Sequence, residues 1–432
     1  MQSNENLHKV NPELFKGQTP YKLEGKSYYA YLDSVEKIYG KTHLRLDCII
    51  KSIADSLEIN SESIMNLPSI VIEISGDSKR INELFNNKEL YNLESKWMKI
   101  TTSISKSELQ QQQYFNFIQI SNPNEINNYD LSEVVLFENL DPTSQAKINE
   151  IIFTTTIKES SESEVISFLN KLSFKDLCYL NVYNVGQGNC SAIVTSDNIP
   201  QIYFDVGGGS GANKSSYPPS FKICHTEKPQ VILSHWDVDH IQTAVFDPRI
   251  LNSVWLVPKH KSISATAMHI AQTLINRGNL ICWNNNLTYI DFSNHRIVKC
   301  TGKSGNKNNS GLSLFFSPTP NQFILLPGDA TFRYIPDHPN GELIGLVASH
   351  HGAKASIRGM PAASKGAMLV YSFGNGNTHG HAHTLARKAY IKNGWGKGLE
   401  TRNGNITIRS GGTMLQTPCN SRGCTLNVVQ QF

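Results

Sequence analysis

The sequence lacks several features that would assign the chain to a common class of protein. Its 432 residues contain no apolar run of transmembrane length, and the N-terminus lacks the basic and then apolar pattern of a secretion signal. None of its eight cysteines forms a C-x-x-C pair, so Cys419 and Cys424, the nearest pair, are expected to be reduced structural thiols. We therefore predict a soluble, cytoplasmic protein that does not engage a membrane.

Two catalytic signatures are also missing. There is no G-x-S-x-G elbow that would provide a serine nucleophile. The run Gly302-Lys303-Ser304 is not a nucleotide P-loop, because Ile297 stands where that motif needs a glycine. Charge is nearly balanced, with 40 Lys and Arg residues against 36 Asp and Glu residues, so net charge alone does not indicate nucleic-acid binding.

The chain does contain a dense cluster of metal-binding side chains. The run from Ser234 to His240 reads Ser-His-Trp-Asp-Val-Asp-His and directly follows the apolar residues 231–233. Imidazole and carboxylate together suit zinc, manganese or iron. Aspartate and histidine also occur in surface turns and helix caps. Four such side chains in six positions behind an apolar strand nevertheless favour a metal site.

The same pattern recurs downstream, each time as an apolar run that ends in polar or metal-binding residues. Continuous apolar runs predict strands that are buried on both faces, and the loops after such strands carry functional residues in layered α/β folds. We expect these strand ends to line one site. The later runs are residues 323–326 before Asp329, residues 343–348 before His350 and His351, and residues 368–373 before Asn377, His379, His381 and His383.

The order HxDxDH, GD, HHG and GNxNxxGHxH resembles the metallo-β-lactamase fold. Within that superfamily the chain is most similar to the hydrolase domain of the ComEC-type competence (DNA-uptake) family. Residues 184–189 and 204–208 resemble that family's D-V-G-Q-G-D turn and the glycine loop after its next strand, and residues 403–408 fit its final strand. The resemblance covers residues 177–432 and implies an α/β fold of the αββα sandwich type.

The resemblance also implies two divalent ions, zinc or manganese, in one site. Asp329 would bridge them, and one of the adjacent His350 and His351 would complete the shell of the second ion. Asp237 departs from the broader superfamily, where many members have a second histidine, and its harder oxygen donor makes manganese plausible beside zinc. The other ligands would be His235 and Asp237 for the first ion, and Asp239 and His240 for the second.

Two ions about 3.5–4 Å apart suit hydrolysis by a shared, activated water, so the nucleophile would not be a side chain. An imidazole at the rim would bind substrate phosphate or protonate a leaving group. Hydrogen bonding of these rim side chains to the loop backbone is an equally good explanation for any one of them. The catalytic candidates are Asp239, Asp329 and His383, and the substrate-binding candidates are Lys354, Asn377, His379, His381 and His383.

Basic residues in the loops near the site favour a phosphate-containing substrate, although charge on surface loops is more often simply solvated. With the resemblance, they predict a phosphodiesterase or nuclease that acts on DNA, as an effector in a bacterial defence system. One alternative is a hydrolase of a small phosphodiester, such as a cyclic nucleotide or a phosphorylcholine ester, with Trp236 and Trp255 either as the wall of a narrow pocket or as ordinary core residues. Another is a binding protein with a vestigial metal site. The basic residues are Lys259, Lys261, Lys303, Lys307, Lys354 and Arg358.

Residues 1–157 are predicted to form a separate small α/β or α+β domain of unknown function, which would dock a partner protein, recognise a ligand or cover the active site. Residues 69–74 predict a strand after Pro68. Residues 158–176 predict a connector helix, because Ser161 and Glu164 form a capping box before an apolar stripe. The hydrolase domain would then span residues 177–432. A helix is predicted from the spacing of Leu46, Ile49, Ile50, Ile53 and Leu57.

Overall fold

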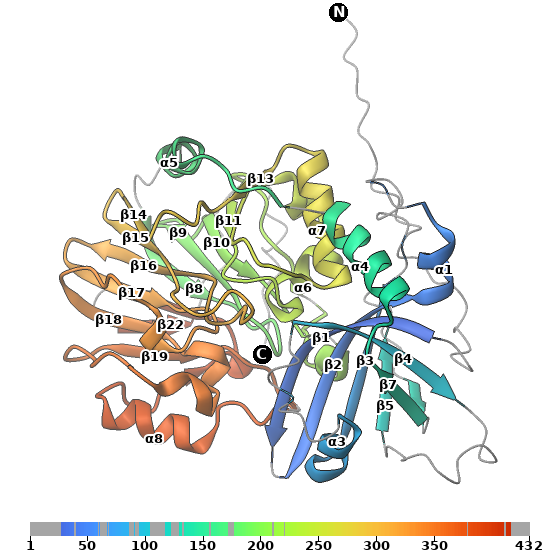
Figure 1. Ribbon diagram of the computed structural model, residues 1–432. Coiled ribbons are helices and arrows are strands. Elements are labelled where there is room, and N and C mark those ends of the chain that lie inside the picture. Colours follow the sequence, from blue (N-terminus) through green and yellow to red (C-terminus); the bar gives the residue numbers. More distant parts are fainter. Residues whose placement is uncertain are drawn as a thin grey trace, which may run out of the picture.

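The computed structural model describes residues 27–38, 40–58, 60, 67, 69–85, 90, 95–103, 117–121, 129–131, 134–154, 157–171, 177–209, 211–219, 221–377, 379–409 and 412–415. Within these residues the chain is a mixed α/β protein, as predicted, and it has three β-sheets (Figure 1). No helix among them is long and apolar enough to cross a membrane. The six cysteines in this part of the chain are free, and Cys419 and Cys424 lie outside it.

The first sheet is antiparallel and comes from the N-terminal part of the chain. Its strands lie in the order β6-β5-β3-β2-β1-β4-β7. Alternate residues of its central strands, such as Tyr28, Leu46 and Ile72, form an apolar cluster on one face. The predicted strand at residues 69–74 is confirmed as part of β3. The elements are β1 (Ser27–Ile38), β2 (Lys41–Ile50), α1 (Lys51–Ser56), β3 (Ser69–Asp77), α3 (Ser78–Leu84), β4 (Trp97–Ser103), β5 (Phe117–Ser121), β6 (Tyr129–Leu131), β7 (Val134–Glu138) and α4 (Pro142–Thr154).

The predicted helix that begins at Leu46 is wrong in its first half. β2 continues to Ile50, and only residues 51–56 form a helix, α1. The end of β2 is buried on both faces, because Leu46 enters the cluster of the first sheet while Ile49 enters a second cluster on the opposite face. In a strand that is buried on both faces, apolar and polar residues do not alternate. Together with the short helix that follows, the apolar residues of this strand therefore show the spacing of a single helix.

Two further sheets make up the rest of the fold. The second sheet has the order β13-β12-β11-β10-β9-β8-β21-β22, and the third has the order β14-β15-β16-β17-β18-β19-β20. Strands β10 to β13 are parallel to one another, as are β17 to β20. The strands are β8 (Leu177–Val182), β9 (Cys190–Thr195), β10 (Pro200–Val206), β11 (Gln230–Ile232), β12 (Trp255–Val257), β13 (Leu280–Cys282), β14 (Tyr289–Phe292), β15 (His295–Lys299), β16 (Leu312–Thr319), β17 (Gln322–Leu326), β18 (Glu342–Val347), β19 (Met368–Tyr371), β20 (Leu399–Glu400), β21 (Ile406–Arg409) and β22 (Gly412–Leu415).

These two sheets pack face to face between helices. Apolar side chains from both, such as Phe204 and Ile324, form the cluster between them. Residues of α6 and α7, such as Ile241 and Met268, cover the outer face of the second sheet, and Tyr390 of α8 belongs to the cluster on the outer face of the third. The layers therefore run helix, sheet, sheet, helix (Figure 1). The helices are α5 (Glu162–Lys171), α6 (Val238–Phe246), α7 (Ala265–Asn276) and α8 (Thr384–Lys392), and the short 3-10 turns are η4 (Gly211–Ser216), η5 (Pro248–Asn252), η6 (Phe332–Tyr334), η7 (Ser349–Gly352), η8 (Lys354–Ile357) and η9 (Thr401–Asn403).

Within the predicted connector at residues 158–176, the structure forms a helix, α5, over Glu162–Lys171, and its role as a connector stays a prediction. Ser161 and Glu164 form the expected capping box: the Ser161 N–H donates to Glu164 Oε2 at 2.7 Å, and the Glu164 N–H donates to Ser161 Oγ at 3.2 Å. The apolar face of the helix, which includes Phe168, joins the cluster between the two packed sheets.

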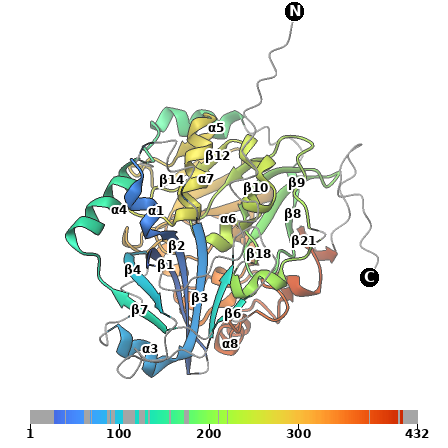
Figure 2. The same ribbon diagram turned by 90° about the vertical axis from the view of Figure 1, so that its right-hand side faces the viewer.

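The first sheet is docked against the helix layer rather than standing apart (Figure 2). One apolar cluster contains Tyr29 and Ile49 of the first sheet together with Met268 of α7. Asp47 Oδ2 accepts the N–H of Thr266 in the first turn of α7 at 2.8 Å. Because this cluster runs across the proposed boundaries, the division into residues 1–157, 158–176 and 177–432 stays a prediction.

Candidate metal centre

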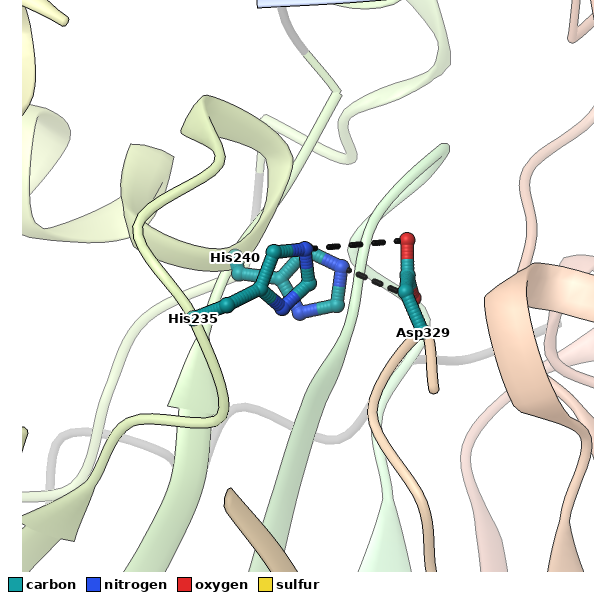
Figure 3. Close-up of side chains that lie close together, drawn as sticks. All are labelled: His235, His240 and Asp329. Atoms are coloured by element: carbon teal, nitrogen blue, oxygen red, sulfur yellow. Dashed lines mark ion pairs between the residues drawn. The ribbon is translucent and has the colours of Figure 1, made fainter. Parts of the chain in front are cut away.

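Three strand ends bring metal-binding side chains to one place. The loop after β11 carries His235 and leads into α6, which carries His240, and the turn after β17 carries Asp329. Figure 3 shows both imidazoles pointing toward the Asp329 carboxylate. The η7 turn after β18 adds His350 and His351. The four strands predicted from apolar runs are confirmed, and β11, β17 and β18 position these side chains.

The start of α6 is held in place by its backbone. Asp237 is the N-cap residue, but its side chain makes no capping hydrogen bond, so capping does not explain its presence. The Asp239 carbonyl accepts the N–H groups of Asn189, at 3.2 Å, and Gly208, at 3.1 Å. Gly207 permits this approach, because a Cβ at that position would lie 1.8 Å from the same carbonyl oxygen. The glycine loop after β10 therefore positions Asp239.

Asp205 is a residue of this site that the sequence reasoning missed. It lies at a bulge in β10, has a left-handed φ of 61° and is fully buried. Its Oδ2 accepts the Nδ1–H of His240 at 2.8 Å, the hydroxyl of Ser234 at 2.8 Å and the Nδ2–H of Asn189 at 2.9 Å. A carboxylate so placed fixes the ring and tautomer of His240 and leaves Nε2 to face the site. The available signal was an aspartate within an apolar strand.

Two overlapping groups of side chains can hold a metal ion, and they share His240. The ligand atoms within each group lie within 4.8 Å of one another. His240 Nε2 lies 3.1 Å from an Asp329 oxygen, and His351 Nε2 lies 3.2 Å from an Asp239 oxygen. Both nitrogens are buried and make no well-aligned hydrogen bond, so their contacts among the described residues are the ion pairs with these carboxylates. Buried polar atoms are nearly always satisfied, so this arrangement fits a bound cation. The groups are His235, His240 and Asp329, and Asp239, His240 and His351.

The electrostatics of this cluster favour a cation. Burial favours the neutral acid at Asp329, but His350, His240 and His351 hold its pKa well below the usual range. Burial likewise raises the pKa of Asp239, but His240 and His351 lower it by more, so the pKa lies well below its usual range. Burial would lower the pKa of His240, but Asp329 and Asp205 raise it well above its ordinary value. The carboxylates therefore stay ionised and the imidazole attracts a proton, which a divalent ion would replace.

The remaining carboxylate of the motif is already paired with a cation. Lys307 Nζ forms an ion pair with Asp237 Oδ1 and lies 3.1 Å from Asp33 Oδ1 of the first sheet. Asp237 Oδ2 lies 3.1 Å from His235 Nε2. Despite burial, Lys307 and His235 hold the pKa of Asp237 well below its usual range, and the two aspartates raise that of Lys307. Neither metal-binding group among the described residues includes Asp237.

The structure shows which of the two adjacent histidines points inward. The side chain of His351 is 2% exposed, whereas that of His350 is 24% exposed. His351 Nδ1 donates to the Ser372 carbonyl at 2.7 Å, which directs Nε2 toward Asp239. His350 Nε2 lies 3.6 Å from Asp329 Oδ2 on the more exposed side. Both histidines have positive φ, 48° and 54°, a conformation that is uncommon outside glycine and typical of functional turns.

Two of the predicted rim residues contact the imidazole cluster. His381 stacks on His351 with ring centroids 5.6 Å apart, and His379 lies 5.6 Å from His381. Polar side chains orient both rings: Gln187 Nε2 lies 3.1 Å from His381 Nδ1, and Asn213 Nδ2 lies 2.7 Å from His379 Nε2. Gln187 lies in the motif at residues 184–189 but was not predicted to be a site residue, and Asn213 was not identified from the sequence.

The other predicted substrate residues are placed differently. Asn377 holds its own loop, because its Nδ2–H donates to the His381 carbonyl at 3.1 Å and its Oδ1 accepts the His381 N–H at 2.9 Å. His383 is the N-cap of α8, where its Nδ1 accepts the Leu385 N–H at 3.1 Å. Lys354 is exposed in η8.

The two tryptophans suggested as the wall of a pocket are core residues. Trp236 and Trp255 are fully buried in the apolar cluster that α6 and α7 share with the second sheet. Their indole N–H groups donate to backbone carbonyls of Pro258, at 3.0 Å, and Ile250, at 3.1 Å. An aromatic wall built from them is therefore wrong.

Comparisons with known proteins identify no family for the chain. No family model matches it, and no curated protein sequence is significantly similar to it. Among solved structures, the crystal structure of an archaeal metallo-β-lactamase superfamily protein from Sulfolobus tokodaii matches with 12% identity over 38% of this chain and 67% of that chain. The TM-score is 0.22, which does not establish a shared fold. The superfamily assignment therefore stays a proposal that rests on the motifs.

Proposed function

We propose that the chain is a metal-dependent hydrolase of metallo-β-lactamase type that cleaves phosphodiester bonds, with DNA as its substrate. The observation that carries this proposal is the pair of buried Nε2 atoms of His240 and His351, which make no hydrogen bond and face the carboxylates of Asp329 and Asp239. Imidazole nitrogens that are aimed at carboxylates without a well-aligned hydrogen bond have the donor arrangement that a bound divalent ion would satisfy better than a proton does. The order of these residues along the chain supports the superfamily assignment.

The roles of the chain's residues follow from their contacts. When bound, a divalent ion such as zinc or manganese lowers the pKa of a coordinated water and stabilises negative charge on the attacked group. Asp205 and the Ser372 carbonyl each hold the Nδ1–H of one imidazole, so that His240 and His351 present Nε2. His350, beside Asp329 and partly exposed, is placed to give a proton to a phosphate or leaving oxygen.

Phosphodiester cleavage on DNA is supported by charge and by the ComEC-type motifs. Lys354 and Arg358 are exposed shortly after η7, where they can attract a polyanion. Lys307, in contrast, is buried in an ion pair and is not free for phosphate. A cytoplasmic location, a partner protein bound through the first sheet and a role in bacterial defence are further parts of this proposal.

The test combines metal content with cleavage. The full chain, loaded with manganese or zinc, is assayed for cleavage of fluorescent single- and double-stranded DNA, of RNA and of bis(p-nitrophenyl) phosphate. The comparison variant is Asp329→Ala, and the matched control is Asp197→Ala, because Asp197 is an exposed carboxylate in a turn. We expect bound metal and DNA cleavage in the wild type and the control, and the loss of both in Asp329→Ala.

Each other outcome contradicts a different part of the proposal. Cleavage of the small diester with intact nucleic acids would favour the small-molecule phosphodiesterase. Bound metal with no cleavage of any diester would contradict phosphodiester hydrolysis. A chain that stays metal-free in added zinc and manganese would contradict the metal centre and favour a binding protein with a vestigial site.

A further inference from the structure

Lys307 places a positive charge inside the proposed metal centre. Its ammonium pairs with Asp237 on one side and lies 3.1 Å from Asp33 on the other. The side chains of Lys307 and Asp33 are 3% and 1% exposed. An ammonium has three N–H donors and no lone pair, so it cannot bind a metal ion. It competes with one for the same carboxylate oxygen.

The first sheet is built to hold this ammonium. β1 has a register irregularity at Asp33, which leaves that residue out of the pairing with β2, and such bulges re-aim a side chain. The ring of Tyr31 lies 4.8 Å from Lys307 Nζ and offers its π face to the charge. Arg45 of β2 lies 3.8 Å from the second oxygen of Asp33 and helps to balance its charge.

The loop that carries Lys307 is also held in place, in this case by the third sheet and the metal-binding motif. Asn309 accepts the Gly302 N–H with its carbonyl, at 2.7 Å, and the Thr331 N–H with its side chain, at 2.8 Å. The Leu312 N–H donates to the Ser234 carbonyl at 2.8 Å, directly before His235. The position of Lys307 is therefore fixed from both sides.

We propose that Lys307 is a built-in cation that keeps a divalent ion from Asp237. Because the two metal-binding groups share His240 and neither includes Asp237, the chain then binds one ion, held by His240. The inference deepens the proposed function and rests on it. Asp33 acts as a positioning residue through Lys307. The first sheet thereby contributes to the metal content, because Asp33 helps to hold Lys307 beside Asp237.

The test counts ions. The full chain is saturated with manganese, freed of unbound metal, and its bound ions are counted by elemental mass spectrometry and by native mass spectrometry. We expect one ion in the wild type and two in Lys307→Met. Lys303→Met is the matched control, because Lys303 is an exposed lysine of the same loop, and it should bind one ion.

A second variant guards against misfolding. Lys307→Met leaves Asp33 without one of its cations, so Asp33→Asn/Lys307→Met, which removes both charges, is measured alongside it, and near-ultraviolet circular dichroism confirms packing. Two ions in this double variant support the proposal. Two ions in the wild type, or one ion in the folded variants, would overturn it while leaving the proposed hydrolase intact. No ion in the wild type would overturn the metal centre itself.

Discussion

The two sides of the proposed metal centre balance buried carboxylates in different ways. On one side Asp239 and Asp329 face imidazoles whose Nε2 atoms are buried and make no hydrogen bond. On the other, Asp237 is paired with Lys307, which the first sheet holds. A carboxylate that already has a fixed ammonium partner needs no further cation, whereas a carboxylate that faces imidazoles can share a metal ion with them in place of a proton.

The contrast shows that a motif does not determine the role of each of its residues. Asp237 and Asp239 stand two positions apart in the same six-residue motif, and both have a pKa that is held well below the usual range. The cation responsible differs: at Asp237 it is mainly Lys307, and at Asp239 it is mainly His240. A lysine keeps its place on the carboxylate, while an imidazole can exchange a proton for a metal ion.

The largest expected effect is the loss of metal binding in Asp329→Ala. Asp329 faces four imidazoles, and its removal leaves them without their shared carboxylate; the distances are 3.1 Å to His240, 3.6 Å to His350, 3.8 Å to His235 and 3.9 Å to His351. The affinity should fall by more than the roughly 10–100-fold that follows the loss of an outer partner. Isothermal titration with zinc measures it. An affinity close to that of Asp197→Ala would contradict the assignment of this side as the binding side.

Asp205→Asn should weaken metal binding by roughly 10–100-fold without removing a ligand. Asp205 accepts the Nδ1–H of His240, and an amide at that position can present an N–H instead and disfavour the tautomer that exposes Nε2. The same titration, with circular dichroism to confirm the fold, gives the result. An unchanged affinity would mean that His240 is not oriented by Asp205.

Asp47 tests how the first sheet is docked. Burial raises the pKa of Asp47 from 3.8 to about 6, and no cation is paired with it among the described residues. Because the folded pKa lies above the unfolded one, its contribution to stability is fully present below pH 3.8 and is lost as the pH rises through about 6. Asp47→Asn should therefore raise the free energy of unfolding at pH 8 by about 2 kcal/mol and by much less at pH 4. Urea denaturation at both pH values measures this difference, and a gain that is equal at both would contradict it.

The smallest expected effect is that of removing the ion pair as a unit. Asp237→Asn/Lys307→Met leaves the net charge unchanged and keeps the ligands on the His240 side. The affinity for the first ion should stay within about threefold of the wild type, because Asp237 belongs to neither metal-binding group. A threefold change corresponds to less than about 1 kcal/mol. A loss as large as that of Asp329→Ala would show that Asp237 is itself a ligand.

The strands that carry this site could be predicted from the sequence, because each is marked by residues that are adjacent in the chain. Apolar runs that end in histidine or aspartate marked the strands before His235, Asp329 and His351, and the capping box at Ser161 marked the start of α5. The prediction of a helix from Leu46 was wrong because it also relied on local spacing. A strand that is buried on both faces has no alternation, and its spacing does not distinguish it from a helix.

The pairing of Lys307 could not be predicted in this way. Asp33 and Lys307 are 274 positions apart, and nothing in either neighbourhood indicates that a bulge in β1 would aim one at the other. Asp205 was nearer to prediction, since it belongs to the motif at residues 204–208, but its contact with His240 depends on a left-handed φ at the bulge in β10. The positions of Lys307 and Asp205 depend on the docking of the first sheet and on the bulges in β1 and β10, which the motifs do not indicate.

Anomalous X-ray scattering at the zinc absorption edge, on crystals of the full chain grown with zinc, is the most direct test of the central claim. We predict a single strong peak in contact with His240, the residue that both metal-binding groups share, with Lys307 still paired to Asp237. A peak between His235 and Asp237, with Lys307 displaced, would contradict the account.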